Sequence, residues 1–206
     1  MEVFDGTVYI EEKLDGSQFS IVLRNGDVEV YSRGRNIVRG FEPTVYRGIW
    51  SWVYSRYSEL VNVPEYYVLY GEWLRVRHTV PYDMLPDWAV IFDVLDLRSN
   101  RFLDYSLKKR VVDDLGLTSP PLVCVLNVKC STRRDVDDVV RKLARLAEGK
   151  SAFSRIARSM EDVVVKNYGK NLFAKLINPW FDREVEEHEL FGGGVKFNRL
   201  ACWSKD

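Results

Sequence analysis

The chain has 206 residues, of which 46% are hydrophobic and 29% charged, and its formal net charge is zero. This composition predicts one domain with a substantial core, and the balanced charge argues against a broadly basic protein that wraps nucleic acid while allowing a local basic cleft. No apolar run reaches membrane length, and Cys124, Cys130 and Cys202 have no metal-ligand spacing. We therefore expect a cytoplasmic protein with reduced thiols and no membrane partner.

Short strands are expected to alternate with a few helices. Residues 8–10 and 19–23 have the pattern of half-buried strands, and residues 15–17 are predicted to be the hairpin turn between them. We expect Gly16 in this turn to take a positive φ and to let a ligand come close. A second turn at Asn25-Gly26 leads to a strand over 28–31, which ends in a basic loop at 32–35.

The middle of the chain is expected to contain a helix and two strands. Pro43 is predicted to open an aromatic-rich helix that runs to about residue 57. Its predicted buried face consists of Val45, Ile49, Trp52 and Val53. Strands are predicted over 66–70, which residues 71–73 close, and over 88–95.

The second half continues the alternation. Ser106 is predicted to cap a helix that Gly116 ends, and a strand follows over 122–128. Residues 133–147 are predicted to form an amphipathic helix with a buried stripe of Val136, Val139, Val140, Leu143 and Leu146. Strands are expected over 161–166 and 172–177, then a short helix over 184–190 and a polar tail.

Lys13 is the first candidate for chemistry, because it stands at the predicted end of a strand just before Asp15-Gly16. A lysine amine held in this way can attack phosphorus or a carbonyl group if its surroundings lower its pKa. The pattern Lys-x-Asp-Gly by itself favours a solvated hairpin, so the rest of the chain has to decide between the two interpretations.

Six short motifs in order make the chain resemble the covalent nucleotidyltransferases, the superfamily of ATP-dependent RNA and DNA ligases and messenger-RNA capping enzymes, and within it the RNA ligases. The motifs are Lys13-Leu14-Asp15-Gly16, Ser32-Arg33, Tyr70-Gly71-Glu72, Phe92-Asp93-Val94, residues 161–166 and Lys175. Each motif is weak alone, but six in register are specific. The resemblance implies an α+β nucleotidyltransferase fold, in which antiparallel sheets pack face to face with flanking helices and ATP lies in the cleft between the sheets.

The resemblance also implies an activity, ATP-dependent RNA ligation with Mg²⁺, for which Mn²⁺ can substitute. Lys13 would form lysyl-AMP, AMP would move to a 5′-phosphate RNA end, and a 3′-hydroxyl would displace AMP, as RNA repair requires. Negative charge develops on phosphoryl oxygens at each step, so the site needs fixed cations and a metal ion. The implied catalytic residues are Lys13, Asp15, Lys166 and Lys175. The last two would also lower the pKa of Lys13.

The remaining roles are implied position by position. Glu161 would help to hold the metal ion. Phe92 would stack on adenine, Glu12 would touch the edge of the base, and Glu72 and Arg33 would contact the ribose or the RNA end. The complete implied nucleotide-binding set is Glu12, Lys13, Leu14, Gln18, Arg33, Glu72, Phe92, Lys166 and Lys175.

Three positions depart from the family pattern. Gln18 stands where DNA ligases usually have arginine and nick-sealing RNA ligases asparagine, which favours RNA over DNA. Asp162 replaces the usual glycine of the fourth motif, and Ile177 replaces the second lysine of the fifth. Residues 182–206 are too few for an OB-fold, so we expect a single nucleotidyltransferase domain over 1–206 that ends in a short helix and tail. A homodimer or an RNA-binding partner would then help to hold the substrate.

Two other functions stay open at this point. One is a capping-type guanylyltransferase that uses GTP, which the absence of an OB-fold and the resemblance of residues 77–86 to RNA ligases disfavour. The other is a non-catalytic nucleotide- or RNA-binding module with this fold. The departures at Asp162 and Ile177 keep this second alternative open.

Overall fold

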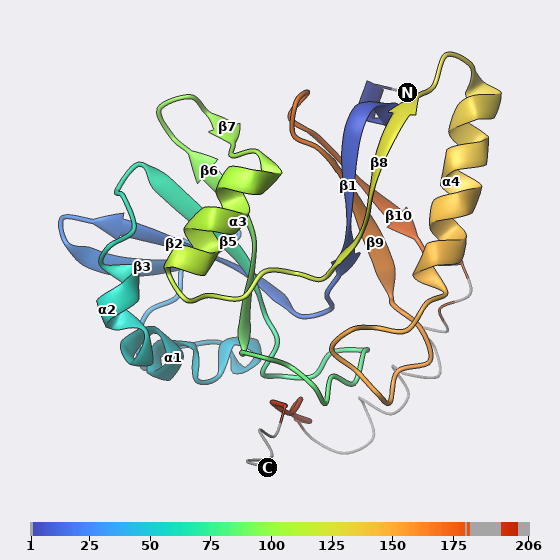
Figure 1. Cartoon of the computed structure of the whole chain (residues 1–206). Helices are drawn as coiled ribbons and strands as arrows, with labels where there is room; N and C mark the ends of the chain where they lie inside the picture. Colours follow the sequence, from blue (N-terminus) through green and yellow to red (C-terminus); the bar gives the residue numbers. More distant parts are fainter. Residues whose placement is uncertain (1, 180, 182–194, 202–206) are drawn as a thin grey trace, which may run out of the picture.

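The computed structural model describes residues 2–179, 181 and 195–201, and it contains two antiparallel sheets that lie side by side (Figure 1). Sheet A contains β1 (Asp5–Lys13), β8 (Leu122–Lys129), β9 (Asp162–Asn167) and β10 (Leu172–Ile177), in the order β10-β9-β1-β8. Sheet B contains β2 (Ser17–Arg24), β3 (Asp27–Ser32), β4 (Arg35–Asn36), β5 (Tyr67–Trp73), β6 (Ala89–Asp96) and β7 (Arg101–Phe102), in the order β4-β3-β2-β5-β6-β7. The predicted antiparallel sheets are confirmed.

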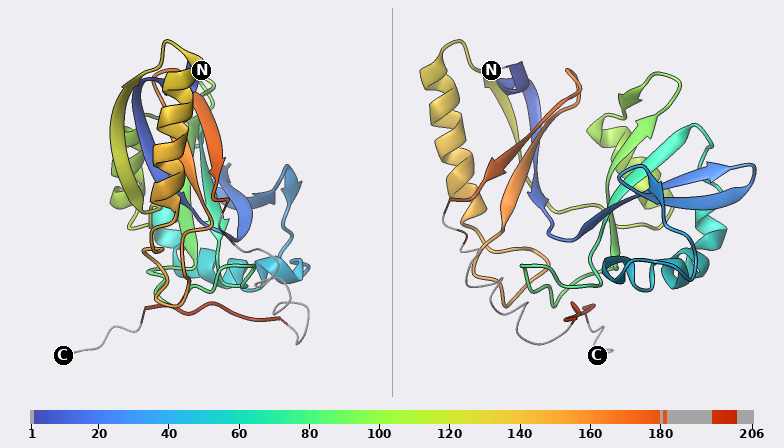
Figure 2. Two further views of the ribbon diagram at one scale, coloured as in Figure 1. Left: turned by 90° about the vertical axis from the view of Figure 1, so that its right-hand side faces the viewer. Right: turned by 180° about the vertical axis from the view of Figure 1, so that it is seen from behind.

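The helices flank the sheets, as predicted. Helix α4 (Arg133–Ala147) packs on sheet A, on the side away from sheet B (Figure 2). Helices α1 (Ile49–Ser55) and α2 (Tyr57–Leu60) pack against sheet B. Helix α3 (Tyr105–Asp114) contacts both sheets, because Val112 joins the core under sheet B while the Tyr105 ring stacks on Tyr9 of β1 at a centroid distance of 4.4 Å.

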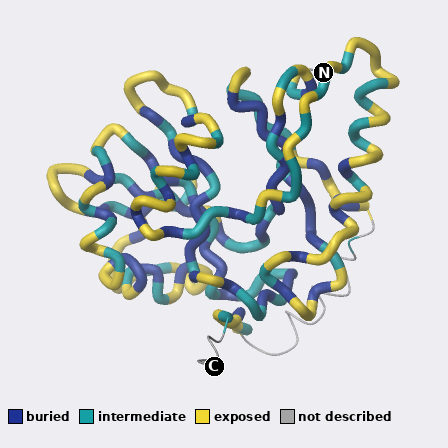
Figure 3. Tube along the Cα trace, in the orientation of Figure 1, coloured by how far each residue is buried: buried dark blue, intermediate teal, exposed yellow. Residues whose placement is uncertain are grey.

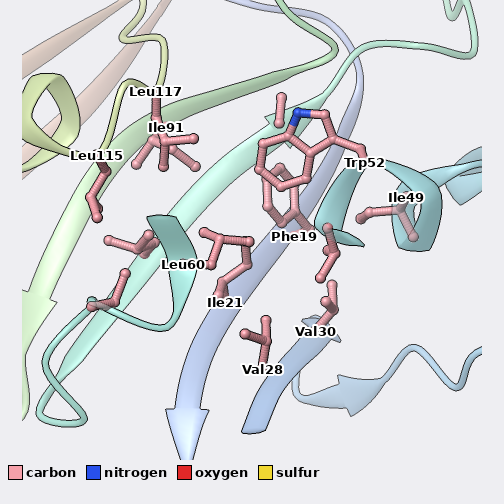
Figure 4. Packing of buried hydrophobic residues seen from close by; sticks show 14 of the residues in the cluster. Phe19, Ile21, Val28, Val30, Ile49, Trp52, Leu60, Ile91, Leu115 and Leu117 are labelled. Atoms are coloured by element: carbon pink, nitrogen blue, oxygen red, sulfur yellow. The ribbon is translucent and has the colours of Figure 1, made fainter. Parts of the chain in front are cut away.

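Each sheet has its own hydrophobic core. Strand alternation places Val8 and Ile10 of β1 against α4, and it places Phe19 and Ile21 of β2 against α1 and its neighbours (Figure 4). Buried residues lie along the strands and exposed residues at the loop tips (Figure 3). Neither core contains a residue from the other sheet. The two sheets face each other, as expected, but their apolar faces are covered by helices and their polar faces are turned toward each other.

The connection between β1 and β2 also differs from the prediction. The two strands belong to different sheets, so residues 14–16 cross between sheets and do not form a hairpin turn. Gly16 does not take a positive φ. A Cβ atom at this position would lie 2.4 Å from the backbone oxygen of Trp73 and 2.8 Å from Cδ2 of Leu74. Glycine is required here because the crossing chain passes against β5 and the residues after it.

The predicted helix over 43–57 is interrupted. Residues Thr44–Tyr46 form the 3-10 helix η2, and Gly48 at φ 83° separates it from α1. Val45 therefore leaves the expected buried face and is 37% exposed.

In the second half of the chain, Asp104 and not Ser106 caps α3. The Asp104 side chain accepts a hydrogen bond from the Leu107 N–H.

Helix α4 has the predicted bounds, but its stripe is narrower than expected. Leu143 is fully buried, the three valines pack partly against sheet A, and Leu146 is 37% exposed. The first three residues after the N-terminus form the 3-10 helix η1 (Glu2–Phe4). The predicted strands over 28–31, 66–70, 88–95, 122–128, 161–166 and 172–177 are confirmed, with end shifts of at most three residues, the largest at β5, which includes the closing residues 71–73.

Most of the predicted C-terminal helix and tail, including residues 184–190 and Cys202, lies outside the described residues. Residues 195–201 form a strap along the segment 75–85, where buried Asn198 accepts a hydrogen bond from the Tyr82 N–H and donates one to the Leu74 carbonyl. Cys124 and Cys130 are free thiols. Among the described residues, no helix is long and apolar enough to cross a membrane.

Candidate active site

A cavity of about 510 Å³ lies between the two sheets. Its walls consist of Glu11, Glu12, Lys13, Leu14, Gly16, Gln18, Arg33, Glu72, Val90, Phe92, Asp93, Phe102, Pro120, Val164, Lys166 and Phe173. Of the residues predicted to bind nucleotide, only Lys175 is not in this wall. Segments that are far apart in sequence therefore converge on one site.

The strand period explains why charged side chains face this cavity. On β1, the side chains of Val8 and Ile10 point into the core of sheet A, so the side chains of Glu11 and Lys13 lie on the opposite face of the strand, toward sheet B. The neighbouring strand β9 is in register with β1, and its Val163 and Val165 enter the same core. Val164 and Lys166 of β9 therefore share the cavity face with the polar residues of β1.

The ammonium group of Lys13 forms an ion pair with the Glu161 carboxylate, at an Nζ–Oε2 distance of 2.8 Å. Burial lowers the pKa of Lys13, but the charge and hydrogen bond of Glu161, together with the charges of Asp15 and Glu72, outweigh burial and leave the pKa raised. The expected lowering of this pKa by Lys166 and Lys175 is therefore not found in the free protein.

Lys166 and Lys175 fail to lower that pKa because each has acidic partners of its own. Lys166 Nζ lies 2.7 Å from Glu11 Oε2 and 3.0 Å from Asp93 Oδ2. Lys175 Nζ lies 2.7 Å from Asp162 Oδ2. In the free protein these carboxylates cancel much of the positive charge that the sequence places near the cavity.

A buried cluster of two lysines and two acids supports the wall that contains Phe92. Lys108, on α3, forms an ion pair with Glu11, and its ammonium donates a 3.2 Å hydrogen bond to the Phe92 carbonyl. Lys166 donates to the same carbonyl at 2.7 Å. Burial, followed by the charge of Lys166, lowers the pKa of Lys108, and burial raises the pKa of Asp93.

Sequence reasoning missed Lys108 and two of the three phenylalanines of the wall, Phe102 and Phe173. Lys108 lies on the same helix face as buried Val112, so a lysine within the apolar stripe of α3 was the available signal. Phe102 and Phe173 pack edge to face at a centroid distance of 5.1 Å. The two rings, from β7 and β10, give the cavity an apolar side next to Phe92.

Two further carboxyl groups in the wall have raised pKa values. Burial raises the pKa of Glu72 to about 7, although the charge of Lys13 and a 3.1 Å hydrogen bond from the Gly16 N–H oppose the effect. Burial also raises the pKa of Glu12, whose carboxylate accepts a 3.1 Å hydrogen bond from the Ala152 N–H. Perturbed carboxyl groups in a cavity are typical of binding and catalytic sites.

Asp15 lies beside the cavity but does not belong to its wall. One carboxylate oxygen of Asp15 accepts hydrogen bonds from the backbone N–H groups of Thr79 and Val80, at 2.7 and 3.0 Å. Its own N–H donates to the Tyr82 hydroxyl at 2.9 Å. In the free protein Asp15 therefore fixes the crossing chain to the segment that follows β5.

The two departures in the last motifs occupy neighbouring positions. Asp162 is fully buried, and besides pairing with Lys175 it accepts a 2.9 Å hydrogen bond from the Asn178 N–H. Ile177 pairs with Asp162 in the β9–β10 ladder and is 55% exposed. The aspartate thus has a structural role at the end of β10, where it also holds the lysine side chain.

Among the described residues, no group of three or more histidine, cysteine, aspartate or glutamate side chains is placed to hold a metal ion. Glu161, which was predicted to help hold the metal, contributes one carboxylate at the edge of the cavity. This arrangement fits Mg²⁺, because that ion keeps several waters and is often bound by one or two carboxylates together with substrate phosphates.

Comparisons with known proteins give a family and a fold for the chain. A family model described as RNA ligase matches residues 6–177. A Naegleria gruberi RNA ligase mutant solved with ATP and Mn has a TM-score of 0.66 and 16% identity, over 85% of this chain and 51% of that chain. The same ligase with PPi has a TM-score of 0.66 and 16% identity, over 91% and 53%.

This chain spans about half the length of the Naegleria chains. At this identity the likeness shows a shared fold, and it supports the mixed α and β architecture expected from the sequence. No curated protein matches the chain.

Proposed function

The chain belongs to the RNA ligase family, and we propose that it is an ATP-dependent RNA ligase that forms lysyl-AMP on Lys13. The observation that supports this proposal best is the convergence of Lys13, Glu72, Phe92 and Lys166 on one cavity, although they come from four strands in two sheets. The family match, over residues 6–177, spans all four residues, and the cavity brings them together in space.

In the proposed first step, Lys13 Nζ attacks the α-phosphorus of ATP. A nitrogen–phosphorus bond forms, the bond from the α-phosphorus to the bridging oxygen breaks, and pyrophosphate leaves with the electron pair. The ammonium group has to lose its proton and separate from Glu161 before it attacks. The ion pair therefore holds the amine at the edge of the cavity in a protonated resting state.

We assign the nucleotide to the wall that the sequence predicted. The Phe92 ring would stack on adenine, with Glu12 near the edge of the base and Leu14 and Gln18 beside it. Glu72 and Arg33 would contact the ribose or the RNA end. Lys166, which would contact the phosphates, has its Nζ atom 5.5 Å from the centroid of the Phe92 ring, which would stack on the base. The base site and the phosphate site would therefore be adjacent.

Lys166, Lys175 and a divalent metal ion would balance the charge of the phosphates. Mg²⁺ or Mn²⁺ held by Glu161, water and phosphate oxygens would stabilise the charge that develops on the transferred phosphoryl group. Lys175 would have to leave Asp162 to take part. Lys166 is already directed to the cavity by the β9 register.

The later steps transfer AMP to a 5′-phosphate RNA end and join this end to a 3′-hydroxyl, as in RNA repair. The preference for RNA rests on Gln18, which borders the cavity where the RNA end would lie. We place the activity in a single nucleotidyltransferase unit over 1–206, assisted by a homodimer or an RNA-binding partner. Equal sealing of all-DNA and RNA-ended breaks would contradict the RNA preference.

The first experiment is incubation of the purified protein with Mg²⁺ and either ATP or GTP labelled at the α-phosphate. We expect label from ATP to remain on the wild-type protein after denaturation, because the bond to Lys13 is covalent. Lys13→Arg keeps the charge and the pairing with Glu161 but lacks the nucleophile, so it should take up no label. Lys142→Arg, an exposed change on α4, is the matched control and should label fully.

The outcomes separate the alternatives. Label from GTP and not from ATP would support a capping-type guanylyltransferase. A wild-type protein that binds nucleotide but takes up no label would overturn ligation and support a binding module. Label that persists in Lys13→Arg would place the nucleophile elsewhere.

A further inference from the structure

We propose that residues 33–47 form a surface that binds the single-stranded RNA leading to the cavity. The inference deepens the proposed ligase function, because it assigns the part of the chain that holds the substrate outside the site of chemistry. It rests on four observations about this segment: its charge, its anchoring, its exposed aromatic ring and its continuity with the cavity.

The segment carries a strong local positive charge in a protein whose total charge is zero. It contains four exposed arginines, Arg33, Arg35, Arg39 and Arg47, and one acidic residue, Glu42. Within the described part of the chain, none of the four arginines forms an ion pair. Their charges are therefore available to an anionic partner, in contrast to Lys13, Lys166 and Lys175 in and beside the cavity.

The segment is anchored at two points, so its side chains are held in place. Ile37 is buried, its N–H donates to the Val30 carbonyl at 2.8 Å, and its carbonyl accepts a 2.9 Å bond from the Trp50 indole. Tyr46 is also buried, and its hydroxyl donates to the Gln18 carbonyl at 2.7 Å. Between these anchors, residues 38–45 are displayed on the surface.

An exposed aromatic ring stands among these charges. Phe41 is 84% exposed, the highest value among the large hydrophobic residues of the described chain. Two positions earlier, the Arg39 guanidinium lies 4.8 Å from the centroid of the Tyr54 ring and donates a 3.1 Å hydrogen bond to its hydroxyl. A guanidinium held on the exposed Tyr54 ring, with Phe41 two residues away in the sequence, resembles the platforms on which unpaired bases stack while cations hold the phosphates.

The surface is continuous with the cavity. Arg33, at one end of the segment, lies in the cavity wall, and Gln18, which accepts the Tyr46 hydrogen bond at the other end, lies in the same wall. A strand that lies along this segment can thus enter the cavity at Arg33. Single-stranded RNA is favoured over a duplex because the Phe41 ring needs an unpaired base.

The test measures binding of a 5′-phosphorylated, fluorescent single-stranded RNA of about 12 nucleotides. We expect Arg35→Ala/Arg39→Ala to weaken binding about tenfold and to reduce the slope of log affinity against log salt by about 1.4, since two phosphate contacts are lost. Phe41→Ala should weaken binding of the single strand about tenfold and leave the affinity for a blunt RNA duplex unchanged. Arg134→Ala/Arg145→Ala removes the same charge from α4 and should change neither value.

Labelling of Lys13 by ATP, measured on the same samples, separates this proposal from the ligase proposal. Variants that label normally but bind RNA weakly support the surface and show that the protein is folded. Normal RNA binding by Arg35→Ala/Arg39→Ala would overturn the surface even if the wild-type protein labels. Equal losses for duplex and single strand in Phe41→Ala would overturn the stacking role.

Discussion

Replacing Glu72 by glutamine should stabilise the free protein at alkaline pH. Glu72 borders the cavity, and burial raises its pKa from the ordinary 4.5 to about 7. Glutamine has nearly the same shape, and its side-chain oxygen can still accept the hydrogen bond that the Gly16 N–H donates to the glutamate. The substitution therefore removes the ionisation and leaves the local packing in place.

The direction of this pH effect follows from the number of protons that Glu72 binds in the folded and in the unfolded state. Between pH 4.5 and about 7 the folded state keeps the Glu72 proton while the unfolded state has released it, so this group makes the fold less stable as the pH rises. The pKa difference corresponds to at most about 3 kcal/mol. The side chain is partly exposed to the cavity, and solvent there reduces the expected effect to about 2 kcal/mol.

The assay is urea denaturation of both proteins at several pH values, with a chelator and without nucleotide. The free energy of unfolding of Glu72→Gln should exceed that of the wild type by about 2 kcal/mol near pH 8.5, and by less than half of this near pH 5. Glu65→Gln, a change at an exposed carboxylate, is the control and should follow the wild type at every pH.

A constant difference between Glu72→Gln and the wild type across the pH range would refute the reasoning, because a packing effect does not depend on protonation. A variant that is less stable than the wild type at pH 8.5 would show that the ionised carboxylate is better paired than its burial implies.

Two further substitutions test the walls of the cavity, both by urea denaturation. Lys108→Met should lower the free energy of unfolding by about 3 kcal/mol, because it removes one partner of a buried ion pair. Lys109→Met, which breaks an exposed i,i+4 ion pair, should lower it by less than about 1 kcal/mol. Similar values for the two lysines would contradict the buried role. Gly16→Ala should lower the free energy of unfolding by about 1–3 kcal/mol, because its Cβ would lie 2.4 Å from the Trp73 backbone oxygen. Gly169→Ala should lower it by less, because the nearest atom to its Cβ would be 3.6 Å away.

Local pattern was enough to predict most of the strands, and the resemblance of six motifs to the RNA ligases predicted eight residues of the cavity wall. Short apolar runs, alternating in β2 and continuous in β9, marked the strands, and helical periodicity gave the bounds of α4. The order of the motifs then selected Lys13 from among many lysines. The strand predictions succeeded because a short apolar run bounded by polar or turn residues marks a buried strand, whatever the strand packs against.

Pairing between distant segments could not be predicted in the same way. The residues before and after Gly16 have the pattern of two strands joined by a turn, yet nothing local determines whether such strands pair with each other or with β5 and β9. Similarly, a lysine in the stripe of α3 becomes a buried partner of Glu11 only once α3 lies against both sheets.

The sequence by itself therefore determined which residues form strands, which side chains share a face, and which lysine is the candidate nucleophile. Only the tertiary structure decided which charges neutralise one another. The Lys13–Glu161 pair, at 2.8 Å, joins residues that are 148 positions apart, and Asp162 reaches Lys175 only across a β-ladder. The pKa of a buried group depends on the charges within a few ångströms of it, and those neighbours are set by sheet register and packing, which composition and spacing do not specify.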